Sequence, residues 1–167
     1  KGETIPLRIA RGDQELQRDV EVRLGCASSI ELADTEGFNA YALRSKVVFF
    51  VGLLRLLERD EAIAFVIGHE LSHQIDLGRG KRRSRIPEDE ARADYVGAYL
   101  AERAGYRLDP EDFGLVQAAH AQPRRLAAEP VSHPSTPARQ VLFRDTLAEI
   151  ATKRAQGEAL LPQWRAP

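Results

Sequence analysis

The feature that most constrains this chain is an apolar, helix-like stretch that carries two histidines and a glutamate. From Asp60 to Leu77 the apolar positions recur at helical spacing, Asp60 is a suitable N-cap, and the pattern stops at Gly78. His69 and His73 are four residues apart, which places both imidazoles on one face of such a helix. Burying these groups without partners costs free energy. We therefore expect the fold to bring other polar groups, or an ion, against this face.

The run His69-Glu70-Leu71-Ser72-His73 has the spacing of a metal site with a neighbouring base. Two imidazoles one turn apart can reach the same ion, and Glu70 is placed to take a proton from water that the ion activates. A catalytic zinc site has three protein ligands and keeps one position for water. A third ligand is therefore expected from another segment. The alternative is a pair of core histidines that hydrogen-bond to backbone carbonyls.

A second helix, from Glu88 to Ala104, is expected to supply that ligand, because Pro87 opens it and Gly105 ends it. Glu90 and Asp94 are four apart and share a face. Small residues lie near them: Ala91, Ala93, Gly97 and Ala98. Close packing would bring Glu90 to the metal, and Asp94 could accept a hydrogen bond from a ligand imidazole. The alternative, a solvated acidic first turn, fits Asp94 poorly because it lies in the middle of the helix.

The first third of the chain has strand-like patterns. Period-two alternation at 20–24, short runs at 30–32 and 38–42, and a β-branched and aromatic run at 46–51 predict strands. Residues 1–19 are expected to start with a strand and to include a short helix. The rest is helical, which predicts an α+β fold with a small, antiparallel-containing sheet packed on a helical bundle.

Three further helices are predicted at 52–58, 110–119 and 137–156. A basic loop at 79–85 and a proline-rich loop at 121–137 separate the later helices. Neither repeats nor a domain boundary are visible, so residues 1–167 are expected to form a single catalytic domain. The sequence is also compatible with a piece excised from a longer precursor.

Composition excludes several classes of protein. Lys and Arg (24) nearly balance Asp and Glu (25), so the net charge of -1 gives no reason to expect a nucleic acid partner. The single cysteine, Cys26, excludes an internal disulfide and a cysteine-only zinc site. The longest apolar run, Val47–Leu54, is far shorter than the roughly 20 residues of a membrane-spanning helix. We therefore expect no membrane span in this chain.

The segment Glu90-Ala91-Arg92-Ala93-Asp94, followed by Gly97, resembles the Glu-x-x-Ala-Asp motif of the HtpX and CaaX prenyl endopeptidase family of gluzincins. The similarity covers roughly residues 30–145 and includes the His-Pro region around His133. It implies a zincin-like, minimal gluzincin domain with one zinc ion held by the two histidines of the first motif and by Glu90.

The link between the two motif helices is short and holds no membrane segment, so the chain is similar to a soluble branch of that family. Soluble relatives imply a periplasmic or other extracytoplasmic location and a role in envelope protein quality control. The expected function is a zinc-dependent endopeptidase, whose protein substrate binds as an extended strand at 38–42 or 46–51.

Two questions stay open at this level. The group that stabilises the oxyanion is expected among His133, Tyr95 and Arg139. His133 has a second candidate role as a ligand that occupies the open zinc position and keeps the enzyme latent; the alternative is an ordinary loop histidine. The alternative function is a latent or gated zinc-binding module, chaperone-like, with little proteolysis. The presence of Glu70 favours the interpretation as an enzyme, because a purely structural zinc site needs no general base.

Overall fold

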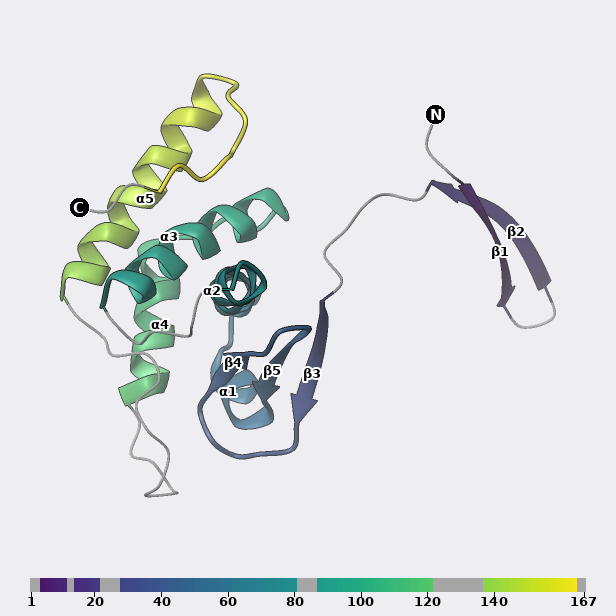
Figure 1. Cartoon of the computed structure of the whole chain (residues 1–167), viewed down its shortest axis with the longest axis horizontal. Coiled ribbons are helices and arrows are strands. Elements are labelled where there is room, and N and C mark those ends of the chain that lie inside the picture. The colour runs from purple at the N-terminus through teal and green to yellow at the C-terminus, as the bar shows by residue number, and fades with distance from the viewer. Residues whose placement is uncertain (1–3, 12–13, 22–27, 81–86, 122–136, 165–167) are drawn as a thin grey trace.

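The computed structural model describes residues 4–11, 14–21, 28–80, 87–121 and 137–164. Two small sheets precede five helices along the chain, which is the α+β class predicted from the sequence. The helices are α1 (Val51–Leu56), α2 (Asp60–Gly78), α3 (Pro87–Arg103), α4 (Pro110–Ala121) and α5 (Pro137–Ala155). Figure 1 shows α2 end-on, between the three-stranded sheet and the other long helices, and α2 contacts β4, β5, α3 and α4.

The strands form two separate sheets. β1 (Thr4–Arg11) and β2 (Gln14–Glu21) pair antiparallel as a hairpin. The second sheet has the order β3-β5-β4 and comprises β3 (Ser29–Ala33), β4 (Ala40–Ala42) and β5 (Lys46–Phe50). β3 is parallel to β5, whereas β4 is antiparallel to it. β5 is thus paired on both sides, while β4 lies at an edge beside α2.

This topology decides between the two strands that were expected to bind substrate. A peptide can add only to a strand with an unpaired edge, and β5 has none. Its residues Val47, Val48 and Phe49 are each at most 2% exposed, because both faces of this central strand are covered. The expectation for 46–51 is therefore wrong, and β4, within the predicted 38–42 segment, is the remaining candidate.

Three aromatic rings join the helices into one core. Phe65 of α2, Phe113 of α4 and Phe143 of α5 are at most 2% exposed. The ring of Phe143 lies 4.9 Å from that of Phe65 and 5.0 Å from that of Phe113, centroid to centroid. Burying each ring contributes about 2 kcal/mol to folding. This cluster sets the position of α4 and α5 against the helix that carries the two histidines.

The segment after α5 folds back onto α3. The backbone N–H of Gln163 donates to the Tyr95 hydroxyl at 3.1 Å, and the Trp164 ring lies 5.4 Å from that of Tyr95. The Tyr95 and Tyr99 hydroxyls both donate to Glu149 of α5. Polar contacts and ring packing thus hold α3 and α5 together on the side of α3 that carries these two tyrosines.

Two local expectations need correction. The 1–19 region forms part of a hairpin and contains no helix in its described residues. Of the strand expected at 20–24, residues 20 and 21 belong to β2, and residues 22–24 lie outside the described part. The N-cap of α2 is Arg59, and Asp60 is the first helical residue, with no side-chain cap. Its carboxylate still lies in the first turn, where the helix dipole favours negative charge.

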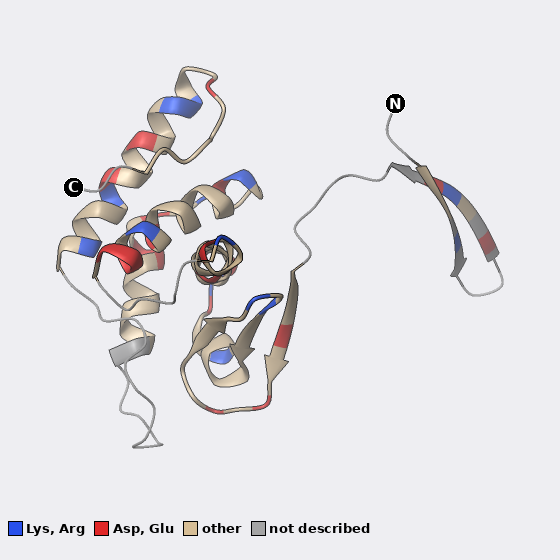
Figure 2. Cartoon of the chain, viewed as in Figure 1, with Lys and Arg blue, Asp and Glu red and all other residues tan. Residues whose placement is uncertain are grey.

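Charges of both signs are interspersed along the described helices, as Figure 2 shows. No described helix is both long enough and apolar enough to cross a membrane. The helices that the sequence predicted at 52–58, 88–104, 110–119 and 137–156 are present as α1, α3, α4 and α5 with boundaries shifted by a few residues. The loops expected at 79–85 and 121–137 lie almost wholly outside the described residues.

Candidate metal centre

Two glycines allow helices α2 and α3 to pack backbone against backbone next to His69. A Cβ added to Gly68 would lie 2.5 Å from the carbonyl oxygen of Gly97, and one added to Gly97 would lie 2.6 Å from the backbone nitrogen of His69. Any side chain at either position would push the backbones apart. Ala93 and Ala98 of α3 are fully buried and extend this small-residue contact. The first turn of α3 is thereby brought against the histidine face of α2.

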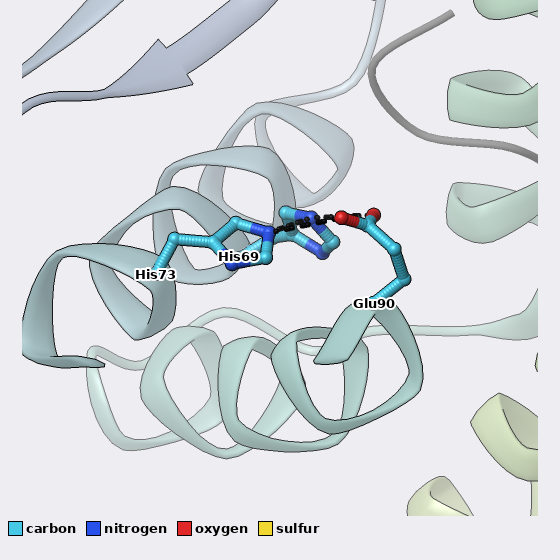
Figure 3. A group of neighbouring side chains, drawn as sticks. All are labelled: His69, His73 and Glu90. Carbon is cyan, nitrogen blue, oxygen red and sulfur yellow. Dashed lines mark hydrogen bonds and ion pairs between the residues drawn. The ribbon is translucent and has the colours of Figure 1, made fainter. Parts of the chain in front are cut away.

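His69 and His73 project from α2 toward Glu90, which lies in the first turn of α3 (Figure 3). The two Nε2 atoms lie 3.1 Å apart. Nε2 of His69 lies 3.4 Å from Oε2 of Glu90, and Nε2 of His73 lies 3.4 Å from Oε1 of Glu90. One ligand atom from each residue lies within 4.8 Å of the others. All three side chains are buried.

These distances fit a tetrahedral zinc site. Ligand atoms at about 2.0–2.2 Å from a tetrahedral zinc ion lie roughly 3.3 Å from one another. The separation of the two Nε2 atoms and the distance from each Nε2 to its nearer Glu90 oxygen are close to this value, and the two imidazoles approach different oxygens of that carboxylate. Two imidazoles and one carboxylate are also a donor set that suits zinc. The sequence predicted His69, His73 and Glu90 as the ligands, and the structure brings these three together.

Asp94 orients one of the imidazoles. It lies one turn after Glu90 on α3, is 1% exposed, and accepts a hydrogen bond from Nδ1 of His69 at 2.9 Å. A carboxylate can only accept, so Nδ1 of His69 carries a proton, and Nε2, which faces His73 and Glu90, is the nitrogen that remains for a metal. The contact is the one expected from the spacing of Glu90 and Asp94, and it selects the tautomer that can bind a metal.

Arg139 of α5 contacts two carboxylates of α3, those of Asp94 and Glu90. Its Nε donates to Oδ2 of Asp94 at 2.6 Å and its Nη2 to Oδ1 at 2.8 Å, which is a bidentate pair. Its Nη1 lies 3.6 Å from Oε2 of Glu90. The guanidinium is almost fully buried. These contacts support a positioning role for Arg139 in place of the oxyanion role considered from the sequence.

The neighbours of each group set its affinity for protons. Burial opposes protonation of His69, but hydrogen bonds with Asp94 and Glu90 outweigh it and raise the pKa to about 10. Burial lowers the pKa of His73. Burial also opposes ionisation of Asp94, yet hydrogen bonds from His69 and Arg139 hold its pKa below the usual value. The site therefore keeps Asp94 ionised in its interior.

Three carboxylates and one guanidinium are buried around the two imidazoles: Glu70, Glu90, Asp94 and Arg139. With these groups ionised and the imidazoles neutral, the formal charge of the site is balanced by a divalent cation. Uncompensated buried charge is costly. A bound divalent cation would therefore offset the buried negative charge.

Glu70 lies next to His69 on α2 and is 1% exposed. Together with His69 it lines one wall of a small cavity, whose other walls come from β4, α3, α4 and α5. Its carboxylate is thus held in an apolar surrounding near the proposed ligands, where a proton acceptor for water is required.

The family model for Peptidase family M48 matches residues 15–76. This match supports a metallopeptidase of that family in the broad sense. It covers His69, Glu70 and His73 and ends before Glu90, so the third ligand rests on the geometry described above. No curated protein matches the chain.

The sequence also offered His133 and Tyr95 as groups that could stabilise the oxyanion. His133 lies outside the described residues, so its roles as electrophile or latency ligand stay predictions. The Tyr95 hydroxyl donates to Glu149 and accepts the N–H of Gln163, so it faces α5 and the C-terminal segment. Tyr95 therefore stabilises the fold, and the structure does not support an oxyanion role for it.

Sequence reasoning missed two residues that shape the site. Gly68 precedes His69 inside a strongly helical stretch, where a glycine costs about 1 kcal/mol relative to alanine, so its presence signalled a close packing contact. Gln117 lies one turn after Phe113, on the buried face of α4, and lines the cavity beside Glu70. Its position four residues after Phe113 and next to Val116, both apolar, was the available signal.

Proposed function

We propose that this chain is a zinc-dependent endopeptidase that hydrolyses peptide bonds in protein substrates. The buried group of His69, His73 and Glu90, with ligand atoms within 4.8 Å of one another, carries the proposal. The match to peptidase family M48 supports the same chemistry. In this proposal one zinc ion is held by these three residues, and the zincin-like domain comprises residues 1–167.

A zinc ion at this position would polarise the scissile carbonyl and activate a water molecule. Glu70 takes the proton from the attacking water and passes it to the leaving nitrogen. Asp94 keeps Nε2 of His69 directed at the ion, and Arg139 keeps Asp94 in place.

The substrate is proposed to bind as an extended strand along the outer edge of β4. This strand pairs with β5 on one side and packs against α2, which carries the histidines. Main-chain hydrogen bonds to an edge strand hold a peptide without regard to its sequence, so a protease can process many substrates in this way.

The first test measures zinc content and casein cleavage of the wild type and of Glu70→Gln, with and without chelator. One zinc per chain, with cleavage lost in the variant and in chelator, is the expected result. Glu58→Gln, at an exposed position just before α2, is the matched control and should behave as the wild type.

Zinc binding without cleavage by the wild type would instead support a latent or gated zinc-binding module, and His133→Ala would then be expected to release activity. Absence of bound metal, in protein purified without chelator and then supplied with zinc, would overturn the proposal.

A location outside the cytoplasm, with a role in envelope quality control, is a further proposal that rests on the resemblance to soluble relatives. Fractionation of cells that produce the full-length protein tests it.

A further inference from the structure

A cavity of about 20 Å³ lies beside His69 and Glu70, which both line it. The charged pair of Asp94 and Arg139 also lines it, and the rest of its wall is mainly apolar: Ala40, Phe65, Val66 and Val116. Since a single water needs roughly 10–15 Å³, the space suits one or two groups of hydroxyl or methyl size and excludes a large side chain.

One uncharged polar side chain also lines the cavity. Gln117 of α4 is 8% exposed, and its Oε1 is buried with no hydrogen-bond partner in the described part of the chain. An unsatisfied buried amide costs about 1–3 kcal/mol, and most such groups in proteins have a partner. Because Gln117 also lines the cavity, a group bound there is placed to supply that partner.

We propose that this cavity binds the side chain of the substrate residue whose nitrogen leaves, and that Gln117 selects a hydroxyl side chain, threonine or serine, at that position. The inference rests on the proposed peptidase function and names its substrate preference. A threonine side chain presents a methyl group to the apolar wall and a hydroxyl group to Gln117.

The position relative to the scissile bond follows from Glu70. In the proposed reaction this carboxylate gives its proton to the leaving nitrogen, so the residue that contributes this nitrogen lies closest to Glu70. Ala40 of β4 also lines the cavity, and an extended peptide paired with β4 passes over its mouth. A side chain that points inward at this point enters the cavity.

A hydroxyl group suits Gln117 better than other polar groups do. It both donates and accepts, so it satisfies the amide whichever end of the amide points inward. A substrate carboxylate would add negative charge beside the buried carboxylate of Glu70, while the nearby guanidinium of Arg139 is already paired with Asp94. Lysine and arginine side chains are too long for a cavity of about 20 Å³.

The test uses two peptides that differ only at this position, threonine against valine, because these side chains have the same shape. For the zinc-loaded wild type we expect kcat/KM to be about tenfold higher for threonine, since valine leaves the amide unpaired. Gln117→Leu removes the amide at similar volume, so it should lose this preference or reverse it. Gln156→Leu, at an exposed position after α5, should keep the wild-type preference.

A binding measurement separates this inference from the proposed function. Glu70→Gln protein, which is not expected to turn over substrate, should bind the threonine peptide about tenfold more tightly than the valine peptide by calorimetry, and the double variant with Gln117→Leu should not. Cleavage or binding with equal preference for the two peptides would overturn the role of Gln117 and leave the peptidase function standing. A binding preference without any cleavage by the wild type would support the cavity assignment and count against the peptidase.

Discussion

Gly68 of α2 and Gly97 of α3 lie backbone against backbone, so that a Cβ on the first would be 2.5 Å from the carbonyl oxygen of the second. This contact determines the distance between the two helices that carry the proposed ligands. The histidines come from one helix and Glu90 from the other, so the geometry of the metal centre depends on two residues that have no side chain.

Gly97→Ala should separate the helices, because its Cβ would lie 2.6 Å from the backbone nitrogen of His69. We expect a loss of about 1–3 kcal/mol in the free energy of unfolding. We also expect zinc affinity to fall at least about tenfold, since small shifts in ligand geometry are costly to a metal site. Urea unfolding and competition with a zinc chelator measure the two effects.

Gly114→Ala is the control for that prediction. Gly114 lies within α4, and a Cβ there would meet nothing within 4 Å. Alanine in an exposed helix interior stabilises by about 1 kcal/mol relative to glycine. A loss of stability in Gly114→Ala, or none in Gly97→Ala, would contradict the packing argument.

Asp94→Asn should weaken zinc binding about 10- to 100-fold while leaving the ligands in place. The amide can present its NH₂ group to Nδ1 of His69, which would favour the tautomer that cannot bind the ion through Nε2. Asp145→Asn, at an exposed position on α5, is the control. Equal zinc affinity of Asp94→Asn and the wild type would show that this carboxylate does not orient His69.

Arg139→Leu should destabilise the zinc-free protein by about 3–5 kcal/mol, because it leaves the carboxylate of Asp94 buried without its bidentate partner. Added zinc should recover part of this loss, since the ion neutralises the neighbouring Glu90. Urea unfolding with and without zinc measures both values. Arg144→Leu, exposed on the same helix, should change stability by less than about 0.5 kcal/mol. A loss in Arg139→Leu that zinc leaves unchanged would contradict this account.

Glu149 should make stability depend on pH in the acid range. Burial raises the pKa of this carboxyl, but hydrogen bonds from Lys153, Tyr99 and Tyr95 outweigh burial and lower it below 4.5. Its contribution is therefore complete above the unfolded-state pKa and is lost as pH falls through the folded-state pKa. Glu149→Gln should flatten the decline in stability between about pH 5 and pH 3. Thermal unfolding across this range, with Glu158→Gln as an exposed control, is the measurement.

Local patterns were sufficient to locate most elements of this fold. The spacing of apolar residues and the positions of proline and glycine predicted α2, α3, α4 and α5 to within a few residues, because these signals act over one or two turns. The β1–β2 hairpin was missed, since pairing of strands depends on register between segments. The N-cap of α2 was misplaced by one residue for a similar reason: Arg59 is fixed by ion pairs with Asp109 and Asp112 of a distant segment.

The sequence by itself determined which residues carry the proposed chemistry. The spacing of His69, Glu70 and His73, and of Glu90 and Asp94, lies within single helices, where side-chain direction follows from residue number. Tertiary structure alone decided how these residues meet. The contact of Gly68 with Gly97, the bidentate pairing of Arg139 with Asp94 and the cavity at Gln117 each join segments that are distant along the chain. Such contacts depend on the packing of whole helices and strands, which no local pattern specifies.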